Sequence, residues 1–221
     1  MSKRRKAAVI ITILLILLES IAIFMSINRQ GTAALVPYTR NSNFLLMVCS
    51  IIYVCLAIEH KDEPDYKMPH FVCLIRFITT SMVTLTFFIV MFLFLPIASF
   101  RYPEEVVPLF TEANFFQHVL CPLLAMLSFV LFEDDPVPVR RDRLISVIPT
   151  DVYALIVCGL NIVRIVKGPY PFFYVYEQPV LVTVLWFFAF TIAAYMLGLL
   201  LSVCRSAVQK RRSKKAVPGK I

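Results

Sequence analysis

Six long apolar blocks, separated by short polar segments, constrain the fold of this 221-residue chain more than any other feature. Each block is near the ~20 residues that a helix needs to cross a bilayer. In lipid, a helix satisfies all its backbone hydrogen bonds within one segment. We therefore expect an all-α integral membrane bundle of six transmembrane helices, forming a single domain over residues 1–204. The predicted spans cover residues 7–26, 37–58, 70–98, 111–132, 147–166 and 179–204.

The composition agrees with this class, because 59% of the residues are apolar and only 16% are charged. A soluble domain is about half apolar and about a quarter charged.

The third block is longer than a span requires, so we expect it to tilt or kink, with Pro96 at its outer end. The first block follows four basic residues like a signal peptide, but its apolar run exceeds the ~7–15 residues of a signal core. The first block is therefore predicted to be a transmembrane helix.

The basic residues predict the orientation. With the N-terminus inside, the cytoplasmic segments carry sixteen Lys and Arg residues and the outer segments carry five. Cytoplasmic loops are enriched in these residues, so both termini are predicted to be cytoplasmic. Residues 205–221 form a basic cytoplasmic tail, read as a solvated topology anchor or as a contact for anionic lipid headgroups. The net charge of +8 thus gathers on one membrane face, and no nucleic-acid-binding motif accompanies it.

Common enzyme and metal signatures are absent from the sequence. The six cysteines lie within predicted helices and form no CxxC pair. No Walker loop, GxSxG, HExxH or GxGxxG occurs, so no cofactor and no metal are predicted. No obvious internal repeat joins the two halves, which weakens a transporter interpretation.

Polar residues inside the spans are the remaining candidates, because the bilayer makes them costly and they usually face the bundle interior. His118 lies about 9 Å from the outer end of the fourth span, on one helical face with Asn114. The second span carries Thr39 and Asn43 near its outer end, and the fifth carries Asn161 and Arg164. We expect these side chains to converge in the outer half of the bundle.

Each candidate also has a structural explanation. Thr39 and Asn43 could cap a helix that enters the membrane, and Arg164 could extend to the outer headgroups. Asn161 could form an interhelical hydrogen bond. His118 is harder to explain in this way, because an imidazole at that depth must find a partner.

Three short motifs resemble a six-helix membrane family. Residues 38–43, Tyr-Thr-Arg-Asn-Ser-Asn, resemble the Thr-x-x-Ser-Asn opening of the family's second helix. Residues 116–118, Phe-Gln-His, precede Cys121-Pro122, like the family's intramembrane His before a Pro. The loop at residues 167–173 is similar to its Tyr-Pro-Phe segment. The family comprises the androgen-induced and androgen-dependent membrane proteins, and this chain is most similar to its bacterial branch.

The resemblance implies an activity and two catalytic residues. Mammalian members are threonine hydrolases that cleave fatty-acid esters of hydroxy fatty acids, with one intramembrane Thr and one intramembrane His. When the family's catalytic residues are carried over to this sequence, Thr39 matches the nucleophile and His118 matches the base. A threonine hydroxyl needs a neighbouring base to become an effective nucleophile. Candidate substrate-binding or oxyanion donors are Asn43, Asn114, Asn161 and Arg164. The expected partners are membrane lipids, with a lipid ester as substrate and no nucleic acid.

Two other classes of function stay open. The same pocket could hold a lipid or small molecule for binding or transport without chemistry. Alternatively, the polar residues could only tie helices together in a structural or regulatory membrane protein. The predicted location is an integral, multi-pass position in a membrane, which is the plasma membrane if the chain is bacterial.

The topology gives the first testable prediction. Reporter fusions or cysteine accessibility should place both termini and the loop containing residues 140–143 in the cytoplasm, because an even number of spans returns the chain to its starting side. A translocated C-terminal reporter would contradict the six-span topology.

Overall fold

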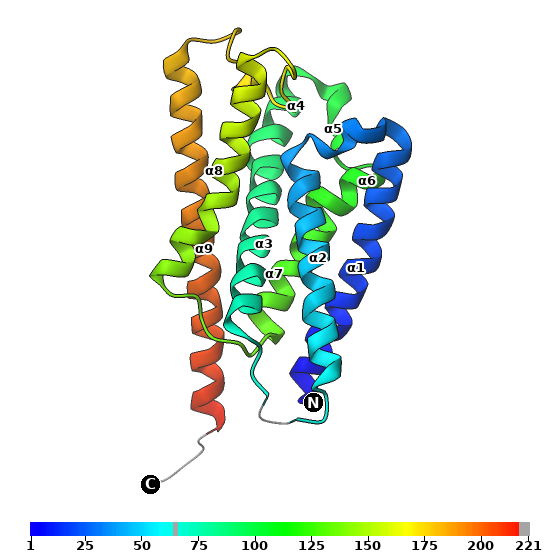
Figure 1. The fold of residues 1–221 in the computed structure, drawn as a ribbon, viewed down its shortest axis with the longest axis vertical. Coiled ribbons are helices and arrows are strands. Elements are labelled where there is room, and N and C mark those ends of the chain that lie inside the picture. Colours follow the sequence, from blue (N-terminus) through cyan, green and yellow to red (C-terminus); the bar gives the residue numbers. More distant parts are fainter. Residues whose placement is uncertain (64–65, 217–221) are drawn as a thin grey trace.

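Six long helices lie side by side in the computed structural model, which describes residues 1–63 and 66–216 (Figure 1). The first helix begins and the last one ends at the same end of the bundle, here called the terminal end; the opposite end is the distal end. All six helical segments are long and apolar enough to cross a membrane, and the described residues contain no strand. The chain is an all-α, multi-pass integral membrane protein.

The first two long helices form a hairpin that turns at the distal end. They are α1 (Lys3–Gln30) and α2 (Tyr38–Glu59), joined by a 3-10 turn at Gly31–Leu35. Gly31 follows α1 with a φ of 57°, a left-handed conformation that glycine adopts without steric cost. Pro37 precedes α2, where its missing N–H leaves no helical hydrogen bond unmade.

The third and fourth spans are interrupted by π-helical turns. The third consists of α3 (His70–Ile89), a π turn (Val90–Phe94) and α4 (Leu95–Arg101). The fourth consists of α6 (Glu112–Phe115), a π turn (Phe116–Leu120), α7 (Cys121–Leu127) and a second π turn (Ser128–Phe132). Between the two spans lie a 3-10 turn (Pro103–Glu105) and α5 (Val106–Leu109).

Two of these π turns are followed closely by a proline. Pro96 is the second residue of α4 and Pro122 is the second residue of α7. Proline has no N–H and its ring crowds the carbonyl four residues earlier, so a wider turn before it relieves both problems. The sequence prediction placed the outer end of the third span at Pro96. The helix instead continues to Arg101, because the π turn absorbs the proline.

The last two long helices differ most from the predicted spans. Helix α8 (Arg140–Ile162) begins seven residues before the predicted span at 147 and ends before 166. Asp142 accepts a hydrogen bond from the N–H of Val139, which caps the charged first turn. Helix α9 (Val180–Ala216) continues past residue 204, so most of the predicted tail is helical. A 3-10 turn at Pro171–Phe173 lies in the loop between α8 and α9.

The centre of the bundle is apolar. Leu15, Leu46, Val83 and Ala125, from α1, α2, α3 and α7, form one buried cluster. Many large apolar side chains on the outside of the helices remain exposed, among them Ile10, Phe24, Phe71 and Phe188. Such a surface would promote aggregation in water, and it matches a lipid environment.

One ion pair lies inside the half of the bundle nearer the termini. Arg76 of α3 donates from Nε to Glu133 Oε1 at 3.0 Å, and each side chain is only 1% exposed. The same guanidinium donates to Ser50 Oγ of α2 at 2.8 Å and to Thr12 Oγ1 of α1 at 3.3 Å. Ser128 donates to the same Glu133 oxygen at 3.0 Å. The pair therefore links four of the six spans.

Arg205 attaches the last helix to this ion pair. Its Nη2 donates to the backbone oxygens of Glu133 at 3.3 Å and Asp135 at 2.8 Å. Its guanidinium also lies 4.3 Å from the centre of the Phe129 ring. Burial raises the pKa of Asp135 to about 6, an effect that the nearby Arg205 opposes. The sequence predicts Arg205 to lie in the basic tail, but the residue is buried within the bundle.

The buried pair generates a stability prediction. Replacing Arg76 by Met leaves the Glu133 carboxylate without its cation, which should lower the free energy of unfolding by about 3–5 kcal/mol. The exposed pair Arg29–Glu112 is the matched control, and Arg29→Met should cost less than about 1 kcal/mol. Circular dichroism during unfolding in mixed micelles measures both values.

A double variant separates the loss of the cation from a loss of packing. Arg76→Met combined with Glu133→Gln should recover much of the lost stability, because no charge then remains unpaired. Equal effects of Arg76→Met and Arg29→Met would refute the importance of the buried pair.

Candidate functional site

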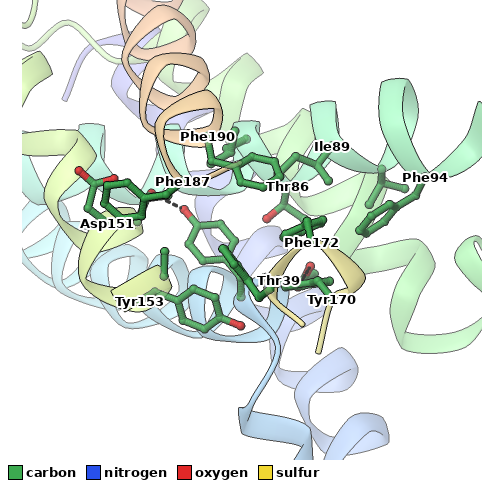
Figure 2. A pocket seen from close by; sticks show the side chains of 16 residues that line it. Thr39, Thr86, Ile89, Phe94, Asp151, Tyr153, Tyr170, Phe172, Phe187 and Phe190 are labelled. Atoms are coloured by element: carbon green, nitrogen blue, oxygen red, sulfur yellow. Dashed lines mark hydrogen bonds between the residues drawn. The ribbon is translucent and has the colours of Figure 1, made fainter. Parts of the chain in front are cut away.

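Thr39 lies in the first turn of α2, at the distal end of the bundle, and it is 9% exposed. The first N–H groups of a helix have no partner within the helix. The phenol oxygen of Tyr170, in the loop before α9, accepts from the N–H of Thr39 at 3.4 Å. The same Tyr170 oxygen lies 3.5 Å from Thr39 Oγ1, and either hydroxyl can donate. Figure 2 shows these two side chains next to each other.

His118 lies within the π turn before α7 and is partly buried. Its Nδ1 is 2.8 Å from the carbonyl oxygen of Leu109, in the last turn of α5. A carbonyl oxygen can only accept, so Nδ1 carries the hydrogen of this bond. In the neutral ring, Nε2 then holds the free lone pair. The contact therefore sets which nitrogen can act as a base.

Thr39 and His118 line the same cavity, which has a volume of about 540 Å³. Its walls come from the start of α2, the third and fourth spans, the segment between these two spans, the loop before α9, and α9 itself. The polar members of the wall include Arg40, Asn114, Gln117 and Tyr170. Most of the other wall residues are apolar, among them Leu93, Phe94, Ile97, Phe172 and Trp186. The cavity is large enough for part of a lipid.

A second, much smaller cavity of about 40 Å³ also has Thr39 in its wall (Figure 2). Its walls come mainly from α3, α8, α9 and the loop before α9. Aromatic rings dominate them, including those of Phe172, Phe173, Phe187 and Phe190. Thr39, Phe94, Tyr170 and Phe172 line both cavities. Thr39 therefore lies where the two spaces meet.

Within the described part of the chain, no hydrogen bond joins Thr39 directly to His118. Thr39 Oγ1 is instead paired with Tyr170, whose hydroxyl is partly buried. Burial raises the pKa of Tyr170, and its hydrogen bonds with Thr39 oppose that shift. The phenol is therefore neutral near pH 7 and able to donate a hydrogen bond.

Asn43 holds the site together and does not line either cavity. It is fully buried, and its Nδ2 donates to the backbone oxygens of Thr39 at 2.7 Å and Gln117 at 3.1 Å. Both amide hydrogens are thus used to connect α2 with the helix of His118. The predicted role as an oxyanion donor does not fit this geometry. Asn114 does line the large cavity, with its Nδ2 bonded to the carbonyl of Pro108 at 2.9 Å.

Asn161 and Arg164 lie apart from Thr39 and His118, contrary to the expected convergence of three helices. They line a separate cavity of about 350 Å³. The Asn161 side chain donates to the carbonyl of Lys167 and accepts from the N–H of Val175 at 3.3 Å, so it orders the loop after α8. Arg164 has a φ of 60°, which directs the chain away from α8, and its guanidinium lies over the Tyr176 ring.

Sequence reasoning missed Tyr170, Arg40 and Gln117 as residues of the site. Tyr170 belongs to the Tyr-Pro-Phe loop that carried part of the family resemblance, so that motif was the available signal. The sequence indicates Arg40 only as a charge of an outer segment, yet it lines the cavity and donates to the carbonyl of Ala34 at 3.3 Å. Gln117 is buried beside His118. Among the described residues, no group of three or more His, Cys, Asp or Glu side chains could hold a metal ion.

Comparisons with protein-family models, curated proteins and solved structures find no match for this chain.

Proposed function

We propose that this protein is an intramembrane hydrolase of lipid esters, with Thr39 as the nucleophile and His118 as the base. The supporting observation is that both side chains line one cavity while Leu109 holds the His118 ring with Nε2 unprotonated. The resemblance of residues 38–43 and 116–122 to a family of threonine hydrolases points to the same pair. If the chain is bacterial, the membrane is the plasma membrane.

The proposed reaction has two halves. In the first, Thr39 Oγ1 attacks the ester carbonyl and its proton passes to His118 Nε2. The bond to the alcohol oxygen then breaks, and His118 returns the proton to that oxygen, which leaves an acyl group on Thr39. In the second half, water attacks the acyl-threonine, releases the acid and restores both residues.

Tyr170 is the proposed stabiliser of the oxyanion. Its neutral hydroxyl lies 3.5 Å from Thr39 Oγ1, close to where the carbonyl oxygen becomes negative. One such donor typically contributes about 3–4 kcal/mol to the transition state. Tyr170 takes the role that the sequence prediction gave to Asn43, Asn161 and Arg164.

Binding or transport of a lipid without chemistry is the second candidate. It is favoured by the absence of a direct Thr39–His118 hydrogen bond in the described structure and by the size of the large cavity. A binding protein would gain thermal stability from a lipid ester that it does not consume.

Alanine variants test the proposed catalytic pair. Thr39→Ala and His118→Ala should each lower ester hydrolysis by at least about a hundredfold, because general-base catalysis alone contributes about 10²–10⁴. The double variant should lose little more, since the two residues act as one unit. Thr39→Ser keeps the hydroxyl and should retain partial activity. Purified protein in nanodiscs, assayed with lipid esters and nitrophenyl esters, provides the rates.

Matched controls are Thr32→Ala and His70→Ala, because Thr32 is exposed and His70 lies at the terminal end of the bundle. Both controls should keep the wild-type rate. If the wild type hydrolyses no ester but is stabilised by one, the protein is a binder and the hydrolase proposal fails. If Thr39→Ala and His118→Ala both match the wild type, hydrolysis occurs elsewhere.

A further inference from the structure

Thr39 separates two spaces of very unequal size, about 40 Å³ and about 540 Å³. An ester bound with its carbonyl carbon at Thr39 Oγ1 must extend in two directions, one for the acyl chain and one for the alcohol. The two cavities provide those two directions. Because the two cavities differ so much in volume, the size of one half of the substrate is restricted much more strongly than the size of the other.

The leaving group determines which half occupies which cavity. The alcohol oxygen must receive a proton when its bond to the carbonyl carbon breaks, and in the proposed mechanism that proton comes from His118. His118 lines the large cavity and does not line the small one. The alcohol must therefore lie in the large cavity, which leaves the small cavity for the acyl chain.

The small cavity has much less room than the large one. Its volume of about 40 Å³ is less than a tenth of the 540 Å³ of the large cavity. Packed aromatic rings prevent easy enlargement: the ring centre of Phe172 lies 4.6 Å from that of Phe190 and 5.1 Å from that of Tyr170. The Trp186 ring stacks on that of Phe190, with the two ring centres 5.5 Å apart. A long acyl chain would have to displace several rings.

The polar groups on this wall are already paired, so the space suits a hydrocarbon chain. Tyr38 and Thr150 share a hydrogen bond of 2.7 Å between their hydroxyl oxygens. The Asp151 carboxylate accepts from Thr191 at 2.7 Å. Thr86 Oγ1 lies 3.4 Å from the carbonyl oxygen of Met82, to which it donates.

We infer that the substrates are esters of a short-chain acid with a long lipid alcohol. The acyl group binds in the aromatic cavity formed around Phe172, Phe187 and Phe190, and the alcohol binds in the large cavity beside His118. This inference rests on the proposed hydrolase function and adds the substrate class.

A series of esters of one long-chain alcohol tests the inference, with acetyl, butyryl, octanoyl and dodecanoyl groups as the acids. The wild type should cleave the butyrate with a kcat/KM at least about tenfold above that of the octanoate, since a misfit of even one methylene changes rates about 10-fold or more. Methyl esters of long acids, which reverse the two halves, should be poor substrates.

Phe190→Ala should enlarge the small cavity and raise kcat/KM for the octanoate until it approaches that for the butyrate. Phe188→Ala is the matched control, because Phe188 lies on the same helix but is 55% exposed. It should keep the wild-type preference. Phe190→Leu, which removes less volume, serves if the alanine variant does not fold. Intact-mass measurement of acylated Thr39 gives a second readout.

The outcomes distinguish the inference from the function on which it rests. Hydrolysis of all acyl lengths at similar rates, or a preference for methyl esters of long acids, would overturn the short-acyl inference and leave the hydrolase function standing. An unchanged preference in both Phe190 variants would overturn the assignment of the acyl chain to this cavity. No hydrolysis of any ester, and no acylated Thr39, would overturn both.

Discussion

The buried contact between Arg76 and Glu133 is the interaction on which the rest of the bundle depends. A charged side chain inside a membrane is costly unless it is paired and hydrogen-bonded. Here one guanidinium contacts α1, α2 and the end of the fourth span, and Arg205 adds α9 through backbone carbonyls. Hydrogen bonds between helices contribute to helix association in lipid, and this set of polar contacts connects five of the six spans. The walls of the cavities at the distal end come largely from the same spans.

The candidate site itself depends on irregular backbone. His118 lies in a π turn that Pro122 explains, and its partner carbonyl belongs to the short helix α5. Tyr170 lies in the loop before α9, and the hydrogen bonds of Asn161 to Lys167 and Val175 order that loop. Regular helices alone would not bring an imidazole, a phenol and a threonine hydroxyl to one place. π turns are frequent at functional sites for this reason.

The periodic parts of the structure were predictable from the sequence, and the parts built by loops were not. The six apolar blocks predicted the six helices because hydrophobic length is a local property. Thr39, Asn114 and His118 could be placed near one another from their depth in the second and fourth spans. Asn161 and Arg164 were predicted at the same depth, but α8 ends at Ile162 and the chain turns away. No local pattern indicates that turn, nor that Tyr170 reaches Thr39.

The position of Thr39 in the first turn of α2 has an electrostatic consequence. The peptide dipoles of a helix add to roughly half a positive charge at its N-terminus. Twenty-two residues follow one another in α2, so the full field of the helix is directed at the end where Thr39 lies. Negative charge that develops on an atom there is favoured even without a cationic side chain. The burial of Thr39 within the protein strengthens this preference, because water then screens the charge less.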